Sequence, residues 1–375
     1  MTARVSLKRA GKFLFPTRRQ VVGGALSTVA LAVLALASWS GVTGEPRSVK
    51  SASVPLRFEG QLPTLGGAVQ WLNSPPLTSA GLRGKVVLVD FWTYTCVNWR
   101  RTLPYIRAWA EKYKSQGLVV IGVHTPEFSF ERDPNNVREF TQEFGIEYPV
   151  AVDTRYGVWN SFNNQYWPAL YLADAQGHIR YHQFGEGAYR ETELAIQQLL
   201  EAAGHTDFDR NLVAINPQGA ETAADWRELK SPETYVGYDL ARGFASPAGT
   251  AADEAQTYIA PARLGLNEWA LSGNWTVGKE AAVSNSSHGR VVFHFHGRDV
   301  NLVMAPPKDR SLSFRVLIDG QPPGAWHGVD VDEQGNGTLD KPRMYQLIRA
   351  LPVSDRQVEI EFTDSGAAVF DFTFG

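Results

Sequence analysis

The stretch VDFWTYTCVNWRRTLPYI, residues 89–106, contains Cys96, the single cysteine of this 375-residue chain. An apolar run that predicts a buried strand leads to Cys96, and a segment with helical spacing follows it. Free N–H groups and the macrodipole at a helix N-terminus favour an anion, so we expect this position to lower the pKa of the thiol and to make it a nucleophile. The alternative is an inert packed cysteine, since free cysteines are often buried.

The neighbours of Cys96 resemble the active-site strand and turn of thioredoxins. Asp90 precedes the cysteine by six residues, Trp92 lies between them, and Pro104 lies inside the following helix. The thioredoxin motif ends in Cys-x-x-Cys, whereas this chain has Trp99 at the position of the second cysteine. The resemblance therefore implies a redox-type site that has only one of its two sulfur atoms.

The resemblance also implies roles for residues outside this stretch. Thioredoxins have a cis-proline that faces the nucleophile and receives the substrate backbone, and Pro168, just before a predicted closing hairpin, matches it. Asp90 would assist proton transfer for a second cysteine; with Trp99 in that place, Asp90 can instead be a buried carboxylate held by hydrogen bonds. The candidate catalytic residues are Cys96, Pro168 and Asp90.

Further residues are expected to line this site. His124 and Glu127 in GVHTPEF follow a second buried strand, at the sheet edge where such folds place their sites, and a structural role in the turn is the alternative. Thr93 precedes Cys96 by three residues, as in the Thr-x-x-Cys of peroxiredoxins, but Val89 stands where that motif has proline. The candidate site lining comprises Trp92, Thr93, Trp99, Trp167, His124 and Glu127.

A single thiol limits the chemistry of this site. A thioredoxin resolves its mixed disulfide with the second cysteine, and this chain has none. Three outcomes are open: an external thiol resolves the adduct, Cys96 cycles through a sulfenic acid after meeting peroxide, or the site is vestigial.

Longer segments resemble one family along most of the chain. The strings GVHTPEF, NQYWPALYLADAQGHIR, FGEGAY, SPETYVGY and VFDFTFG are similar to the periplasmic part of TlpA/DipZ-type redoxins. That resemblance covers roughly residues 54–375 and implies a thioredoxin-like domain followed by a carbohydrate-binding-like β-sandwich. The multi-span electron-transfer region of DipZ-type proteins has no counterpart in this sequence.

The hydrophobic pattern predicts the same two-part architecture. Strand and helix signals alternate over residues 54–204, which predicts an α/β domain with a central sheet covered on both faces. Residues 205–228 predict a linker, because Asn, Gly, Ala and Asp accumulate there. Short alternating stretches separated by turn residues over 229–375 predict an all-β antiparallel sandwich of jelly-roll or carbohydrate-binding-module type.

The first fifty residues differ from the rest. Basic residues between Arg4 and Arg19 precede an apolar run from Val21 to Trp39. This pattern predicts an export signal or an N-terminal membrane anchor for residues 1–50. Arg18-Arg19 loosely fits a twin-arginine signal. We therefore expect the protein to be exported across the cytoplasmic membrane, as a periplasmic protein or anchored facing outward.

Composition excludes several other classes. A net charge of −3 argues against a general nucleic-acid binder, and one cysteine excludes an intramolecular disulfide and any cysteine-based zinc site. His294 and His296 share a face of a predicted strand, but no third metal ligand has a defensible spacing. Trp269, Trp275 and Trp326 are candidates for a sugar-stacking platform or for the core. We predict no cofactor and no metal.

The sequence thus favours an exported thiol–disulfide oxidoreductase that acts through Cys96 and is resolved by an external thiol. Its expected partners are a disulfide- or thiol-containing protein or a small thiol, and an external reductant. The alternatives are one-cysteine peroxide reduction, or a non-enzymatic module that binds envelope polysaccharide or protein on a redox-fold scaffold.

Overall fold

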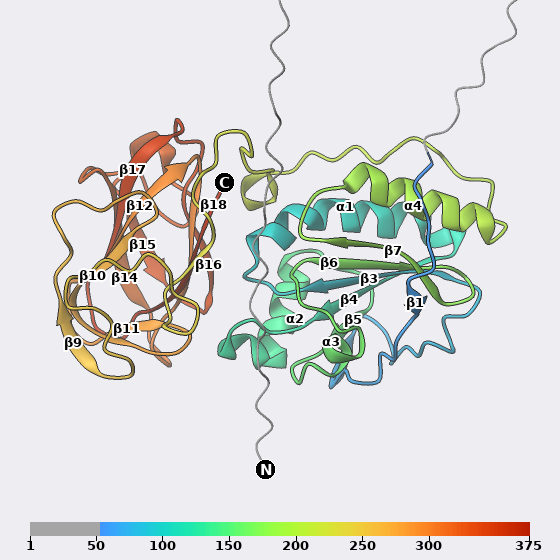
Figure 1. Ribbon diagram of the computed structural model, residues 1–375, viewed down its shortest axis with the longest axis horizontal. Helices are drawn as coiled ribbons and strands as arrows, with labels where there is room; N and C mark the ends of the chain where they lie inside the picture. The colour runs from blue at the N-terminus through green and yellow to red at the C-terminus, as the bar shows by residue number, and fades with distance from the viewer. Residues whose placement is uncertain (1–52) are drawn as a thin grey trace, which may run out of the picture. The chain divides into compact units, whose positions relative to one another are not determined.

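The computed structural model describes residues 53–375, which form two β-sheets with helices on the first (Figure 1). The predicted export signal or anchor, residues 1–50, lies outside the described residues. Within residues 53–375, no helix is both long enough and apolar enough to cross a bilayer.

The first sheet has seven strands in the order β1-β7-β6-β3-β4-β5-β2. Strands β3, β4 and β5 run parallel, and β6 is antiparallel to β3. The strands are β1 (Gly60–Gln61), β2 (Gln70–Leu72), β3 (Val86–Trp92), β4 (Leu118–His124), β5 (Val150–Val152), β6 (Ala169–Ala173) and β7 (His178–Phe184).

Helices cover both faces of this sheet. The helices of this part are α1 (Val97–Tyr113), α2 (Pro134–Glu143), α3 (Gly157–Ser161) and α4 (Tyr189–Ala202), with short 3₁₀ turns η1 (Lys114–Gln116) and η2 (Ser129–Arg132). Apolar side chains of α1, α2 and α4 share one core cluster, and those of α3 belong to another. Figure 1 shows α1 and α4 along the same side of the sheet.

The alternating direction of the side chains along β3 determines which of them contact α1. Side chains of a strand point alternately to opposite faces. Val86, Leu88 and Trp92 join the cluster that contains α1 and α4, whereas Val87 and Phe91 join the cluster that contains α3. Asp90, with the same parity as Leu88 and Trp92, therefore lies on the α1 face.

The predicted linker packs against the first part of the chain. It contains the 3₁₀ turn η3 (Gly219–Glu221), and Glu221 accepts two hydrogen bonds from the Arg107 guanidinium of α1, at 2.8 and 3.0 Å. Ala220 is buried. This connection is thus held to α1 by specific contacts.

The second part is all-β, and every pairing between its named strands is antiparallel. Strand β10 pairs with β12 through residues 269–272 and with β11 through residues 275–277, while β9 pairs with residues 273–276 on the edge opposite β11; β10 thereby joins two layers around one apolar core. The elements are β8 (Thr234–Tyr235), β9 (Ala255–Tyr258), β10 (Trp269–Val277), β11 (Ala282–Ser284), β12 (Gly289–Gly297), β13 (Val300–Ala305), β14 (Leu312–Ile318), η4 (Gly324–Trp326), β15 (Asn336–Leu339), β16 (Arg343–Ile348), β17 (Ser354–Phe362) and β18 (Ala368–Phe374).

The predicted fold class is confirmed: a thioredoxin-like α/β part precedes an all-β antiparallel part. The three tryptophans considered for sugar stacking do not lie together on the surface. Trp269 and Trp275 are buried in the core of the sandwich, and Trp326 is 42% exposed. A stacking platform made of all three tryptophans is therefore wrong.

Candidate active site

Cys96 lies where the thioredoxin resemblance places a nucleophile. Strand β3 ends at Trp92, a short turn follows, and the Cys96 N–H donates to the carbonyl of Thr93 at 3.3 Å. Cys96 has extended backbone angles and is the N-cap of α1, and its carbonyl accepts from Arg100 N–H at 3.0 Å. The sulfur is thus at the carboxyl end of a central strand and at the start of a 17-residue helix.

The direction of the Cys96 pKa is the opposite of the sequence-based expectation. Cys96 is only 6% exposed, and burial raises the pKa of its thiol well above the ordinary value; the carboxylates of Glu233 and Glu127 raise it further. The N–H groups of Asn98 and Trp99 lower it, as expected at a helix N-terminus, but their effect is smaller. Cys96 nevertheless makes no side-chain capping hydrogen bond that would hold the thiolate at the start of the helix.

Trp99 fills the position of a second cysteine and binds Asp90. Its indole Nε1–H donates to Asp90 Oδ2 at 2.9 Å, and its ring stacks on Trp92 with centroids 4.3 Å apart. All three side chains are fully buried. Burial raises the pKa of Asp90 to about 7, and the Trp99 hydrogen bond opposes that rise. The structure thus places Asp90 against Trp99, in keeping with a buried carboxylate held by a hydrogen bond.

Pro168 and Trp167 lie beside the end of β3. The Trp167–Pro168 peptide bond is cis. Phe91 pairs with Ala169, so Pro168 adjoins the end of β3 from which the Cys96 turn departs. Trp167 Nε1–H donates to the carbonyl of Thr125 at 3.1 Å, which ties this loop to the end of β4.

Thr93 and His124 form a buried pair behind the Cys96 turn. Thr93 Oγ1 lies 3.5 Å from His124 Nε2, and neither residue is exposed. His124 contacts the edge of the Trp92 ring and stacks on Tyr94. Burial lowers the pKa of His124 to about 3, so the imidazole is neutral near pH 7. This arrangement supports the turn and supplies no charge.

Glu127 is the predicted lining residue that acts electrostatically on Cys96. It is half-buried, and Tyr235 of β8 donates its hydroxyl hydrogen to Glu127 Oε1. Burial raises the pKa of Glu127 well above its ordinary value, and the negative charges of Glu233 and Glu131 raise it further. A residue of the sandwich thus completes the surroundings of a residue of the thioredoxin-like part.

The acid that holds this loop, Glu131, was not among the predicted site residues. Glu131 is fully buried; its Oε1 accepts from Thr95 Oγ1 at 2.7 Å, and its Oε2 accepts from the N–H groups of Glu127 and Phe128 at 2.6 and 2.9 Å. Glu131 therefore links the turn before Cys96 to the loop that carries Glu127. Thr95 is 36 positions from Glu131, too far in sequence for a local motif to indicate this contact.

The residues that join α1 to the sandwich were not predicted either. Arg101 is 3% exposed; it donates to Glu186 Oε1 at 3.0 Å and to the carbonyl of Phe374 in β18 at 2.9 Å. Val97, next to Cys96, belongs to an apolar cluster with Phe128 and with Phe370 of β18. The first turn of α1 therefore packs directly against the second sheet.

The two histidines considered for metal binding have other partners. His296 Nδ1 lies 2.6 Å from Asp355 Oδ1, and His294 Nδ1 lies 2.8 Å from the carbonyl of Leu264. Over residues 53–375, no group of three or more histidine, cysteine, aspartate or glutamate side chains is arranged to hold a metal ion.

Two family models match the chain in the order of its two parts. Residues 70–182 match the AhpC/TSA family, and residues 231–375 match the thioredoxin like C-terminal domain. The chain therefore contains a thioredoxin-like domain of AhpC/TSA type, followed by a thioredoxin like C-terminal domain.

Among its relatives, Protein DipZ of Mycobacterium tuberculosis (strain CDC 1551 / Oshkosh) is 35% identical over 322 residues, 84% of this chain and 43% of that protein. The chain thus spans less than half the length of that relative. Thiol-disulfide oxidoreductase YkuV of Bacillus subtilis (strain 168) is 28% identical, over 39% of this chain and 97% of YkuV. The structure of a thiol-disulfide isomerase from Corynebacterium glutamicum is 30% identical, over 36% of this chain and 92% of that one, with a TM-score of 0.34.

Proposed function

We propose that this protein is an exported thiol–disulfide oxidoreductase that acts through Cys96 alone. The thiolate of Cys96 attacks a disulfide R–S–S–R; a Cys96–S–S–R bond forms, and R–S⁻ leaves and takes up a proton. Cys96 is oxidised in this step and the leaving sulfur is reduced. The thiolate of an external thiol, R′–S⁻, then attacks the R sulfur of the mixed disulfide; an R′–S–S–R bond forms, and Cys96 leaves as a thiolate.

The observation that carries the proposal is the position of Cys96 together with that of Trp99. Cys96 is the N-cap of α1 at the end of β3, which is the position that the thioredoxin resemblance implies for the nucleophile, and this position supports the proposal. The side chain that would resolve the adduct is a buried tryptophan bound to Asp90. The resolving thiol must therefore come from another molecule, either a small thiol or a protein.

A turnover assay on the full chain tests this function. With glutathione as the external thiol and bis(2-hydroxyethyl) disulfide as the substrate, we expect consumption of the disulfide above the uncatalysed rate, and Cys96→Ser should abolish the excess. Equal rates for the wild type and Cys96→Ser would refute the function. Cys96-dependent consumption of hydrogen peroxide instead of the disulfide would assign the one-cysteine peroxidase alternative.

Export of the chain is part of this proposal. The basic flank and the apolar run that ends at Trp39 support it. Cell fractionation should find the protein outside the cytoplasm, either soluble or membrane-bound. Replacement of Arg18 and Arg19 by Lys should block export if the twin-arginine route is used, and unchanged export would assign the general secretory route.

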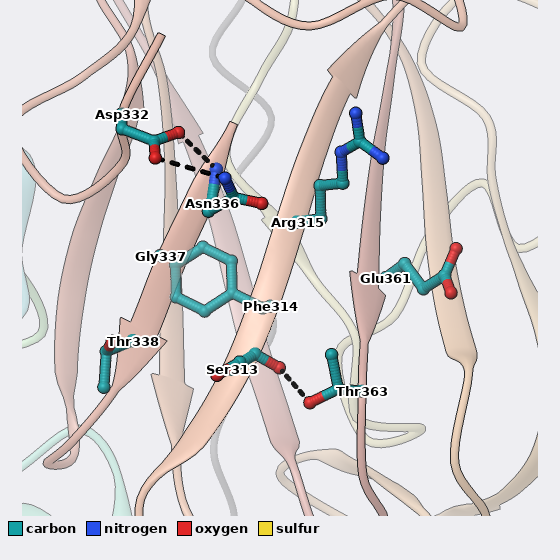
Figure 2. A pocket seen from close by; sticks show the side chains of 9 residues that line it. All are labelled: Ser313, Phe314, Arg315, Asp332, Asn336, Gly337, Thr338, Glu361 and Thr363. Carbon is teal, nitrogen blue, oxygen red and sulfur yellow. Dashed lines mark hydrogen bonds between the residues drawn. The ribbon is translucent and has the colours of Figure 1, made fainter. Parts of the chain in front are cut away.

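Glycan binding by the sandwich is a second candidate function, and one hollow favours it. A depression of about 520 Å³ lies over β14, β15 and β17 (Figure 2). Arg315, Glu361, Thr338 and Thr363 line it with donors and acceptors suited to hydroxyl groups. We propose this depression as the place where an envelope polysaccharide would bind. Retardation of the protein by a cell-wall polysaccharide, lost in Arg315→Ala, would support this proposal; the absence of retardation across a panel of such polysaccharides would remove it.

A further inference from the structure

Three carboxyl groups from separate segments lie together near Cys96. Glu127 follows β4, Glu233 precedes β8, and Asp371 lies in β18. Strands β8 and β18 pair with Tyr235 opposite Asp371, which brings the Glu233 carboxyl into contact with that of Asp371. The Tyr235 hydroxyl donates to Glu127 Oε1. We call Glu127, Glu233 and Asp371 the acidic gate.

The acidic gate runs from the surface into the protein. Glu233 is exposed as a residue, although its carboxyl group loses hydration against Asp371; Glu127 is half-buried, and Asp371 is 3% exposed. Asp371 Oδ1 is buried and accepts no hydrogen bond from an N–H or hydroxyl group of residues 53–375, although the Asp371 carboxyl contacts that of Glu233. A buried carboxylate oxygen without a donor is costly, so this end of the gate can accept a hydrogen bond from an incoming group.

The chain itself supplies too little positive charge for the gate. Arg101 acts on Glu233, but this guanidinium already pairs with Glu186 at 3.0 Å and also donates to a carbonyl of β18. The pKa of each gate carboxyl is raised, first by burial, and for Glu127 and Asp371 also by the charge of Glu233. These carboxyls therefore tend to hold protons, and a cation placed among them would displace the protons and stabilise the charged forms.

We propose that the acidic gate selects disulfide substrates that carry a positive charge, such as an ammonium or guanidinium group, close to the reacting sulfur. The cation binds among Glu127, Glu233 and Asp371 while Cys96 attacks the adjacent disulfide. The sandwich then contributes two of the three residues that determine specificity. This inference rests on the proposed function of Cys96, and it adds the class of substrate.

The test compares three aliphatic disulfides that differ mainly in charge: cystamine, which is doubly positive, bis(2-hydroxyethyl) disulfide, which is neutral, and 3,3′-dithiodipropionate, which is doubly negative. Intact-mass spectrometry of the full chain gives the second-order rate constant for adduct formation at Cys96 with each. Each rate constant is then divided by the rate constant for the reaction of the same disulfide with N-acetylcysteine amide, a neutral thiol. This normalisation corrects for the intrinsic reactivity of each disulfide.

We expect the normalised rate constant to fall from the cation to the neutral reagent to the anion, by about tenfold per step at low salt, since interactions between nearby charges are of that order. Added salt should reduce the differences. Glu233→Gln and Asp371→Asn should each reduce the preference for cystamine about threefold. Glu254→Gln removes an exposed carboxylate that has no part in the gate, and it should leave the preference unchanged.

Equal normalised rate constants for the three reagents would overturn the acidic gate and leave the function of Cys96 intact. A preference that survives in both Glu233→Gln and Asp371→Asn would also overturn it. A native protein whose Cys96 reacts with none of the reagents would refute the proposed function, and this inference with it.

Discussion

Trp99 determines the role of Asp90 and leaves Cys96 without a partner in its own chain. The indole N–H holds one oxygen of Asp90 at 2.9 Å, while the other oxygen is buried without a partner in the described residues. With a pKa of about 7, Asp90 is half protonated at neutral pH. The negative charge of Asp90 therefore lowers the stability of the folded state. Asp90 contacts Trp99 where a thioredoxin would have a second thiol.

Asp90 makes a defined contribution to the pH dependence of stability. Its pKa is 3.8 when unperturbed and about 7 in the fold, so only the folded state binds this proton between those values. Stability therefore falls as pH rises from about 4 to about 7. Asp90→Asn should remove this loss, so that the variant gains about 4 kcal/mol relative to wild type across that window. Urea denaturation at several pH values measures the difference.

His124 has the opposite effect on stability. Burial lowers its pKa to about 3, so its contribution to stability grows as pH rises to about 6.5. Because wild type and Asp90→Asn both contain His124, this effect cancels in the difference between them. A difference between Asp90→Asn and wild type that does not change with pH would contradict the buried state of Asp90.

Trp99→Cys tests whether Trp99 stands in the place of a resolving thiol. Loss of the buried ring should cost about 3–5 kcal/mol, because it leaves a cavity and removes the donor to Asp90. If the variant folds, the new thiol should release a mixed disulfide from Cys96 and form an internal disulfide with it. Circular dichroism first establishes folding, and intact-mass spectrometry then follows release of the adduct. A folded variant that retains the adduct would show that the two positions are not juxtaposed.

At the scale of elements, local patterns predict β3, α1 and the cysteine between them. The apolar run of β3 and the helical spacing after Cys96 depend on neighbours in sequence, and they match β3 (Val86–Trp92) and α1 (Val97–Tyr113). The sign of the Cys96 pKa could not be predicted in this way. It depends on burial and on Glu233, which is brought in by the pairing of β8 with β18.

The same limit applies to Glu131 and Arg101. Glu131 accepts from Thr95, 36 positions away, and Arg101 donates to the carbonyl of Phe374, 273 positions away. No spacing rule connects such pairs. Gly337 of β15 is a further residue whose role depends on distant contacts. A Cβ at Gly337 would lie 2.3 Å from Phe314 Cζ, so glycine is required there by packing.

Glu131 is the element-scale link between the Cys96 turn and the loop of Glu127. Glu131→Gln removes one of the two acceptor oxygens that serve Thr95, Glu127 and Phe128. We expect a loss of about 1–3 kcal/mol in the free energy of unfolding, since a buried donor loses its acceptor. Urea denaturation measures it, with Glu254→Gln as the matched surface control. A loss no larger than that of the control would mean that this link does not hold the loop.

At the scale of the whole described chain, the two sheets share contacts but have separate cores. The core of the sandwich consists of residues from Val236 onward, whereas the cluster around Val97 and Phe128 includes Phe370 and Met344 from the sandwich. The second part therefore has its own source of stability, together with an apolar face that packs on the first.

A fragment of residues 229–375 should reflect both properties. We expect it to fold with a β-type circular dichroism spectrum and a cooperative melt, because its core is self-contained. We also expect it to self-associate, because the face around Phe370 loses its cover, and Phe370→Ser should weaken the association. Sedimentation velocity measures the association. An unfolded fragment would show that the two parts depend on a common core.

The most direct test of the whole account is the formation of one adduct on Cys96 in the native full chain. Incubated with a small disulfide, the protein should gain one mixed adduct by intact-mass spectrometry, stable until an external thiol is added and absent in Cys96→Ser. The rate should increase with pH up to the limit of the folded range, because burial and Glu233 raise the pKa of the thiol and only the thiolate attacks. A thiol that forms the adduct only after denaturation would contradict the account and identify Cys96 as a packed core residue.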